Sequence, residues 1–402
     1  MDRGTRLLIY SHDSFGLGHL RRCRTIAHHL VGRFKQLSVL ILSGSPIIGS
    51  FDFRRRVDFV RVPGVIKLRN GEYVSQTLRL GIDEALEIRR SIIHHTAEVF
   101  APDLFLVDKE PLGLRGEVRS TLEMLQERGT RCVLGLRDVM DEPTSLVDEW
   151  ERKGVFPELA RLYDDIWVYG LPEIFDPLHE LPGLDAFAGR IAFTGYLRRS
   201  LPEHAELHLE HPVPEGRFIL VTPGGGGDGA ELIDWVIRAY EADPDLPHRA
   251  MILFGPFMPA EQREAFQERV NCDPRLEALT FEARVEPYFE RALGVVAMGG
   301  YNTFCEILSF GKPALLVPRT APRLEQYLRA ERAQRSGLLR MLPDDGTRPA
   351  ATMATALRAL PAQPVPPEAD RAAMLRGLER IAELSAPWLE RPGGALQHGR
   401  RA

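Results

Sequence analysis

One stretch in the second half of the chain decides the fold: Val295-Val-Ala-Met-Gly-Gly-Tyr-Asn-Thr-Phe-Cys-Glu306, followed by Gly311-Lys-Pro-Ala-Leu-Leu-Val-Pro318 and then Glu325-Gln326. A β-branched run reaches a glycine pair, an amphipathic helix begins there, and a second apolar strand ends in a polar loop. In open parallel sheets, ligands bind at the carboxyl ends of the strands, where this unit gathers its polar groups. The stretch therefore predicts a parallel α/β sheet with a nucleotide-type site at one edge.

The bulk composition limits the classes of function. A chain of 402 residues with 44% hydrophobic content is too long for one core, so two domains are expected. The net charge of -5 gives no general attraction for nucleic acid, which is therefore not an expected partner. The four cysteines form no C-x-x-C pair, and no apolar run approaches the ~20 residues of a membrane span. We expect a cytoplasmic protein.

Strand and helix signals alternate in both halves of the chain. The expected strands are 5–11, 37–42, 104–107, 132–136, 218–222 and 250–254, and the expected helices include 18–31, 230–241 and 368–384. Such alternation predicts parallel sheets flanked by helices. A Pro-, Gly- and charge-rich segment at 181–214 is the expected linker. The predicted fold class is α/β, with two facing Rossmann-like domains at 1–198 and 199–385, a cleft between them and a disordered tail at 386–402.

A glycine-rich turn follows the strand at 218–222. It reads Thr222-Pro-Gly-Gly-Gly-Gly-Asp-Gly229 and opens the next helix. Backbone N–H groups and the helix dipole favour a phosphate in this setting, and glycines let the phosphate oxygens approach. No Lys follows the last glycine, so the turn is not a P-loop. We expect Gly224, Gly225, Gly226 and Gly227 to bind a diphosphate, and a plain tight turn is the alternative.

The first half contains a loop of the same form, Ser11-His-Asp-Ser-Phe-Gly-Leu-Gly-His19. Gly16 and Gly18 free the backbone, and His19 sits at a helix start, where the dipole lowers the pKa of an imidazole. A neutral imidazole can accept a proton, so His19 is the first candidate base. Asp108, at the end of the strand at 104–107, is the second. A purely structural cap or ion pair is the alternative for each.

Glu306 lies six residues beyond Gly300 on the same expected helix. A carboxylate there can accept two hydrogen bonds from a ribose diol, and its apolar neighbours make an unpaired charge costly. A solvated helix charge is the alternative. Asp243-Pro-Asp245 has the D-x-D form that holds metals elsewhere, but it lies among prolines between a helix and a strand, as a turn would. We expect no metal and no other cofactor.

Together these residues resemble the MurG-like glycosyltransferases of the GT-B fold, over most of the chain and most strongly over 295–326. The resemblance implies that His19 is the histidine of the family's N-terminal glycine loop. It also implies that Glu306 holds the ribose, that Glu325 and Gln326 contact the donor sugar, and that Arg284 and Val285 meet a uracil. Met298-Gly299 replaces the Arg-Ser of many relatives, and Glu325 replaces one of two usual glutamines, so the sugar stays open. The nucleotide-sugar-binding residues expected overall are Gly16, Gly18, Gly224, Gly225, Gly226, Gly227, Arg284, Val285, Gly299, Gly300, Thr303, Glu306, Glu325 and Gln326.

The resemblance implies a glycosyltransferase whose donor is a nucleotide diphosphate sugar, uridine-based by analogy, and whose acceptor is a small molecule, a glycan or a lipid-linked group. A single direct displacement would invert the anomeric configuration, and backbone amides of the glycine turn would stabilise the leaving diphosphate without a metal. Peripheral contact with the inner face of a membrane is compatible with it. The Gly16-Leu-Gly-His-Leu-Arg-Arg-Cys23 segment is also similar to the nucleotide-sugar hydrolase of pseudaminic acid synthesis. A non-catalytic nucleotide-sugar-binding protein is a third reading. We prefer the transferase because the polar segment 67–76 can cover an acceptor.

Overall fold

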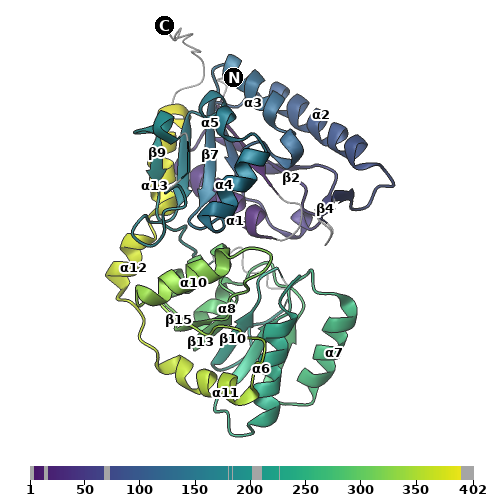
Figure 1. Cartoon of the computed structure of the whole chain (residues 1–402), viewed down its shortest axis with the longest axis vertical. Coiled ribbons are helices and arrows are strands. Elements are labelled where there is room, and N and C mark those ends of the chain that lie inside the picture. The colour runs from purple at the N-terminus through teal and green to yellow at the C-terminus, as the bar shows by residue number, and fades with distance from the viewer. Residues whose placement is uncertain are drawn as a thin grey trace.

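Two α/β halves are stacked along the long axis of the molecule in the computed structural model (Figure 1). The structure describes residues 4–12, 17–67, 73–179, 181–182, 184–201, 211–225 and 227–390. Each half has a parallel sheet with helices packed on it, so the predicted α/β class with two Rossmann-like units is confirmed.

The first sheet is parallel throughout, in the order β3-β2-β1-β6-β7-β8-β9. The central strands β1 and β6 are buried nearly end to end, and this is the pattern of a parallel sheet covered on both faces. The strands are β1 (Arg6–Ser11), β2 (Ser38–Ser43), β3 (Val57–Arg61), β6 (Leu104–Asp108), β7 (Arg131–Arg137), β8 (Asp165–Tyr169) and β9 (Ile191–Phe193). The helices are α1 (Gly18–Arg33), α2 (Ile82–Phe100), α3 (Arg119–Glu127), α4 (Pro143–Arg152) and α5 (Phe156–Leu162), with an antiparallel hairpin of β4 (Val65–Lys67) and β5 (Tyr73–Ser75).

The second sheet is also parallel, in the order β12-β11-β10-β13-β14-β15. Its strands are β10 (Phe218–Thr222), β11 (Arg249–Leu253), β12 (Leu276–Leu279), β13 (Gly294–Ala297), β14 (Ala314–Leu316) and β15 (Arg340–Met341). Its helices are α6 (Ala230–Ala242), α7 (Ala260–Asn271), α8 (Glu286–Arg291), α9 (Tyr301–Phe310), α10 (Glu325–Arg335) and α11 (Ala350–Ala359).

The strand order reverses direction once in each sheet. In the first sheet this happens between β1 and β6, where Ser11 pairs with Asp108 at the ends of the two strands. In the second it happens between β10 and β13, where Thr222 pairs with Ala297. Connections leave these neighbouring strands in opposite directions and open a crevice, so ligands of open α/β sheets bind at such points. The loops that follow β1, β6, β10 and β13 are therefore placed to form a site.

Helix α9 is the helix that was expected to begin after the glycine pair Gly299-Gly300, and it is buried. Every residue from Tyr301 to Leu308 is buried, so its apolar character continues around the helix. Gly299, just before it, has φ 84°, and a Cβ there would lie 2.9 Å from Leu316 Cδ1. A side chain at this position would therefore be strained and crowded, which explains the glycine pair.

Three boundaries differ from the sequence predictions. β9 lies inside the expected linker 181–214, because its backbone pairs with β8. The expected helix at 368–384 is two helices, α12 (Glu368–Met374) and α13 (Gly377–Leu389), since the chain bridges to Leu197 at Arg376. The expected tail began too early, because α13 continues to Leu389, which packs in the core.

Helix α13 returns from the second half to the first. Figure 1 shows it beside the first sheet, and the Thr5 hydroxyl donates to the Leu389 carbonyl at 3.1 Å. A core cluster continues through α9 and α13 into both sheets. The proposed domain limits at 198 and 385 stay predictions, but α13 lies against the first half although its sequence follows the second.

Candidate active site

His19 and Asp108 meet where the order of the first sheet reverses. His19 lies in the first turn of α1, and Asp108 is the last residue of β6. His19 Nδ1 lies 2.5 Å from Asp108 Oδ2, while Arg22 donates from Nε to Oδ1 at 2.8 Å and from Nη2 to Oδ2 at 2.5 Å. An ionised carboxylate only accepts hydrogen bonds, so Nδ1 of His19 carries the proton. Nε2 is then the atom able to accept one.

Burial and charge keep this pair in the ionisation states that base catalysis needs. Burial lowers the pKa of His19 to about 3, with Arg22 adding to the effect and Asp108 opposing it. Burial alone would raise the pKa of Asp108, but the Arg22 guanidinium and the bond to His19 hold it well below its usual range. At neutral pH the imidazole is neutral and the carboxylate is charged. The side chain of Asp108 is only 1% exposed, so Asp108 orients His19.

The second half contributes loops rich in backbone N–H groups. The turn after β10 begins at Gly224, which has φ 94° and donates its N–H to Thr222 Oγ1 at 3.2 Å. Helix α9 begins after Gly300 with no side-chain cap and no acidic residue in its first turn. Unpaired N–H groups and the positive end of the helix dipole there attract an anion.

A cavity of about 480 Å³ lies between these two sets of groups and is lined by residues of both halves. Within the described residues, six basic and four acidic side chains line it, so it favours an anionic ligand. The predicted site residues that line it are Gly18, His19, Gly224, Gly225, Gly227, Val285, Gly300, Thr303, Glu306, Glu325 and Gln326.

Three predicted residues do not line this cavity. Asp108 lies behind His19. Arg284 forms an ion pair with Asp52 of the first half, and the Gly299 carbonyl accepts from Arg329 Nη1 at 2.9 Å. Gly16 and Gly226 lie outside the described residues.

Glu306 lines the cavity and is already paired. Arg21 of α1 donates to Glu306 Oε1, and the Glu306 carboxylate is 1% exposed. Burial raises the pKa of Glu306 against the opposing charge of Arg21. Arg21 belongs to the first half of the chain and Glu306 to the second, 285 positions later. A ligand that binds Glu306 would therefore share its carboxylate with Arg21.

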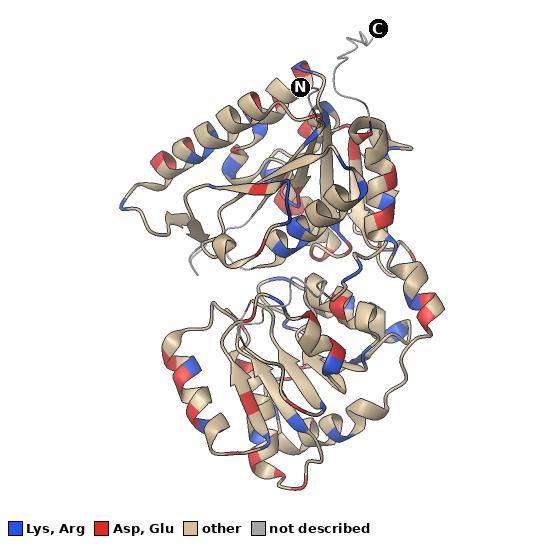
Figure 2. Cartoon of the chain, turned by 180° about the vertical axis from the view of Figure 1, so that it is seen from behind, with Lys and Arg blue, Asp and Glu red and all other residues tan. Residues whose placement is uncertain are grey.

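Further ion pairs join the halves beside the cavity. Arg137, at the end of β7, donates through both terminal nitrogens to Glu325, the first residue of α10. Burial would raise the pKa of Glu325, but Arg137 lowers it to about 2. Arg329 of α10 donates to both oxygens of Asp138, and both side chains are completely buried. Figure 2 shows charged residues of both signs along the facing edges of the two halves.

Comparisons with known proteins agree with this geometry. Residues 218–384 match the glycosyltransferase family 28 C-terminal domain. A UDP-N-acetylglucosamine--N-acetylmuramyl-(pentapeptide) pyrophosphoryl-undecaprenol N-acetylglucosamine transferase of Thermotoga petrophila is 27% identical over 127 residues, which are 31% of this chain and 34% of that protein. The same enzyme of Thermotoga maritima matches equally. The chain therefore spans about a third of the length of the curated relatives it matches.

Solved structures extend the likeness to the whole fold. A glycotransferase of kitacinnamycin has a TM-score of 0.62 at 16% identity, covering 97% of this chain and 100% of that one. The calicheamicin glycosyltransferase has a TM-score of 0.57 at 18% identity, covering 97% and 99%. The chain is thus similar to MurG-like glycosyltransferases over part of its second half, and to GT-B glycosyltransferases in its overall fold. Its fold, with two facing Rossmann-like units, is the GT-B fold.

Most of the cations that line this cavity were not predicted from the sequence. Arg21, Lys109, Arg137, Arg319 and Arg323 all line the cavity. Lys109 and Arg137 lie at the carboxyl ends of neighbouring strands, β6 and β7, so the same rule that selected Asp108 could have found them. No comparable signal marks the contact of Arg21 with the second half, because it depends on how the halves meet.

Two further expectations from the sequence concern membrane spans and metal binding. Within the described part of the chain, no helix has the length and apolarity needed to cross a membrane. Asp243 of the D-x-D segment accepts two hydrogen bonds from Arg358 and one from the Asp245 amide, as a turn residue does.

Proposed function

We propose that this protein transfers a sugar from a nucleotide diphosphate sugar to an acceptor hydroxyl, with inversion and without a metal. One observation carries the proposal. His19 of the first half, which Asp108 holds from behind, and the uncapped start of α9 in the second half line the same cavity. A base and an anion-binding surface thus face each other across a space of about 480 Å³, which is within the range of small-molecule sites.

The chain's own residues suffice for a direct displacement. Nε2 of His19 removes the proton of the acceptor hydroxyl, and the oxygen attacks the anomeric carbon on the face opposite the diphosphate. The start of α9, the turn at Gly224 and the nearby Arg319 stabilise the negative charge that develops on the leaving diphosphate. A single displacement inverts the anomeric configuration. Asp108 stabilises the imidazolium that forms.

The donor is proposed to be uridine-based. The name of the Thermotoga relatives contains UDP-N-acetylglucosamine, and the family match covers the half that would hold the nucleotide. In this arrangement Glu306 accepts hydrogen bonds from the ribose, while Glu325 and Gln326 contact the sugar. We place the activity in the cytoplasm, with an acceptor that is a small molecule, glycan or lipid-linked group.

Hydrolysis of a nucleotide sugar is the second candidate, because the same histidine could activate water. A separate cavity of about 540 Å³ in the first half favours transfer. His12 lines that cavity, and the His12 and His19 rings lie 5.9 Å apart, centroid to centroid. A hydrolase has no use for a second organic substrate, whereas a transferase needs such a space beside its base.

Donor binding is tested with a thermal-shift panel of uridine, thymidine, guanosine and adenosine diphosphates. Each added decade of ligand above its dissociation constant stabilises the fold by about 1.4 kcal/mol, so the correct base is expected to raise the melting temperature most. We expect uridine diphosphate to do so. Equal or absent shifts with all four would contradict a nucleotide-binding half.

Calorimetry then tests the ribose contact. Glu306→Ala is expected to weaken uridine diphosphate binding by about 1.5 to 3 kcal/mol, the scale of a charge-assisted hydrogen bond. Glu286→Gln is the matched control, because Glu286 also approaches Arg21, at 3.9 Å, but does not line the cavity. Unchanged affinity in folded Glu306→Ala would reduce Glu306 to an ion-pair partner of Arg21.

A further inference from the structure

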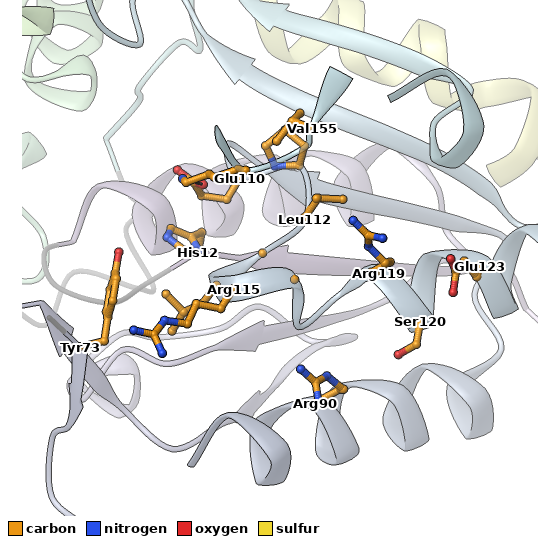
Figure 3. A pocket seen from close by; sticks show the side chains of 15 residues that line it. His12, Tyr73, Arg90, Glu110, Leu112, Arg115, Arg119, Ser120, Glu123 and Val155 are labelled. Atoms are coloured by element: carbon orange, nitrogen blue, oxygen red, sulfur yellow. Dashed lines mark hydrogen bonds and ion pairs between the residues drawn. The ribbon is translucent and has the colours of Figure 1, made fainter. Parts of the chain in front are cut away.

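The cavity of about 540 Å³ in the first half carries a cluster of cations (Figure 3). Its walls come from α2, α3, the segment after β6 and the turn between α4 and α5. Arg90, Arg115, Arg119 and Lys153 line it against two acidic side chains, so the lining has an excess of positive charge. Leu112, Leu114 and Val155 add an apolar part.

The three arginines of the cavity are partly exposed, and each forms an ion pair with a carboxylate of the protein. Their side chains are between 40% and 47% exposed. Arg119 pairs with Glu158 at 3.2 Å, whereas Arg90 pairs with exposed Glu87 and Arg115 pairs with exposed Asp83 at 3.7 Å. Exposed pairs of this kind contribute little and exchange readily. Lys153 differs, because two carboxylates, Glu110 and Glu149, already neutralise it.

The start of α3 points to an anion independently. Arg119 and Ser120 are its first two residues, and both line the cavity. This helix has no side-chain cap and no acidic residue in its first turn, and a cation at its first position opposes the helix dipole. A bound anion would accept hydrogen bonds from the N–H groups at the helix start and from the Arg119 guanidinium, which also pairs with Glu158. Figure 3 shows Arg90 on α2, and Arg119 and Ser120 on α3, among the residues that line the cavity.

His12 separates this cavity from His19, the proposed base. His12 forms part of the cavity wall, and the His12 ring meets the His19 ring edge to face with centroids 5.9 Å apart. In the arrangement proposed below, the hydroxyl of a molecule held in the cavity extends past His12 toward Nε2 of His19. The cations at the α2 and α3 end of the cavity would bind the end of that molecule that is farthest from its hydroxyl.

On these grounds, and resting on the transferase proposed above, we propose that this cavity is the acceptor site. We further propose that the acceptor is a small molecule bearing a phosphate or carboxylate, which Arg90, Arg115 and Arg119 bind. The apolar residues pack on the part of the acceptor between its anionic group and its reacting hydroxyl. The volume of about 540 Å³ suits a molecule of one or two rings.

The probe for binding is phenyl phosphate, compared with neutral benzyl alcohol, on the full chain in the presence of excess uridine diphosphate. The diphosphate occupies the donor cavity, so binding there does not interfere. We expect the anion to bind and the alcohol to bind at least tenfold more weakly. Arg119→Gln and Arg90→Gln should each weaken phenyl phosphate binding about tenfold or more, the factor expected for a charge-assisted hydrogen bond. Affinity for uridine diphosphate should stay unchanged in both variants.

Arg128→Gln is the matched control, because Arg128 follows α3, is 44% exposed and pairs with Glu98 away from the cavity. It should bind phenyl phosphate as the wild type does. Equal binding by wild type and both cavity variants, or displacement of the probe by uridine diphosphate, would overturn the proposal. Failure of uridine diphosphate to bind would instead contradict the proposed donor site. The binding of phenyl phosphate to the other cavity would still test the acceptor site.

A second measurement connects the cavity to the reaction. 4-Hydroxybenzoate and neutral 4-hydroxybenzamide differ only in charge, and both offer a hydroxyl to a uridine diphosphate sugar. We expect transfer to the anionic member to exceed transfer to the amide, and Arg119→Gln to raise its KM with kcat retained. An equal rate for the two acceptors in the wild type would contradict anionic recognition.

Discussion

Replacing His19 by alanine is expected to lower turnover by a factor of ~10² to 10⁴, the usual contribution of a positioned general base. Nε2 is the proton-accepting atom, and it acts mainly in the transition state, so donor affinity should stay nearly intact. His29→Ala is the matched control, because His29 lies on the same helix and does not line the cavity. A fully active His19→Ala enzyme would contradict the proposed mechanism.

The pH profile gives this expectation a second readout. The pKa of His19 is lowered from 6.5 to about 3, so the imidazole stays neutral, and able to accept a proton, as the pH falls from 8 to 5. An unshifted histidine would lose half of its base form near pH 6.5. The acidic limb of kcat/KM is therefore expected well below pH 6. The profile could instead show an acidic limb at pH 6.5. If this limb disappeared in an active variant of another histidine, that histidine and not His19 would be the base.

The second large effect is expected from Arg329→Met. Asp138 would remain completely buried after losing its cation, and breaking a buried pair by removing one partner typically costs 3 to 5 kcal/mol. The unfolding free energy should fall by about that amount in urea titrations. Arg335→Gln, on the same helix but 62% exposed, should change it by less than about 0.5 kcal/mol.

A double variant distinguishes the buried charge from lost packing. Adding Asp138→Asn to Arg329→Met removes the uncompensated carboxylate, so part of the lost stability should return. A cost below about 1 kcal/mol for the single variant would mean that water reaches Asp138 and that the halves are not joined through this pair.

The elements that local pattern defines could be predicted from the sequence. The strands that end at Ser11, Asp108 and Thr222 are continuous apolar runs, and the glycine loops after β1 and β10 interrupt the pattern. The rule that ligands bind at the carboxyl ends of strands then brought His19, Asp108 and the Gly224 turn to one site.

Contacts between distant segments could not be predicted from that pattern. The helix at 368–384 breaks because Gly377 donates to the Tyr196 carbonyl at 3.0 Å, and a Cβ at Gly377 would lie 2.6 Å from the Gly195 carbonyl oxygen. Helical periodicity alone carries no sign of this approach. The pairing of Arg21 with Glu306 and of Arg137 with Glu325 likewise depends on how the two halves meet.

Asp108 shows how geometry refines a role that residue type leaves open. At the end of a strand it was a candidate base, and it stays a predicted catalytic-site residue. Its carboxylate is bound by Arg22 and His19 and does not line the cavity, so we assign it the orientation of His19. Asp138, the other carboxylate at a strand end, is held by Arg329.

The central claim is tested most directly by the release of uridine diphosphate from a uridine diphosphate sugar, with and without a hydroxyl acceptor. For a transferase, release should depend on the acceptor and be matched by one inverted glycosidic bond per diphosphate, read from the anomeric proton of the product. Release into water at the same rate with or without any acceptor would contradict transfer and assign the protein as a hydrolase. Binding of the donor with no release under either condition would assign it as a non-catalytic nucleotide-sugar-binding protein.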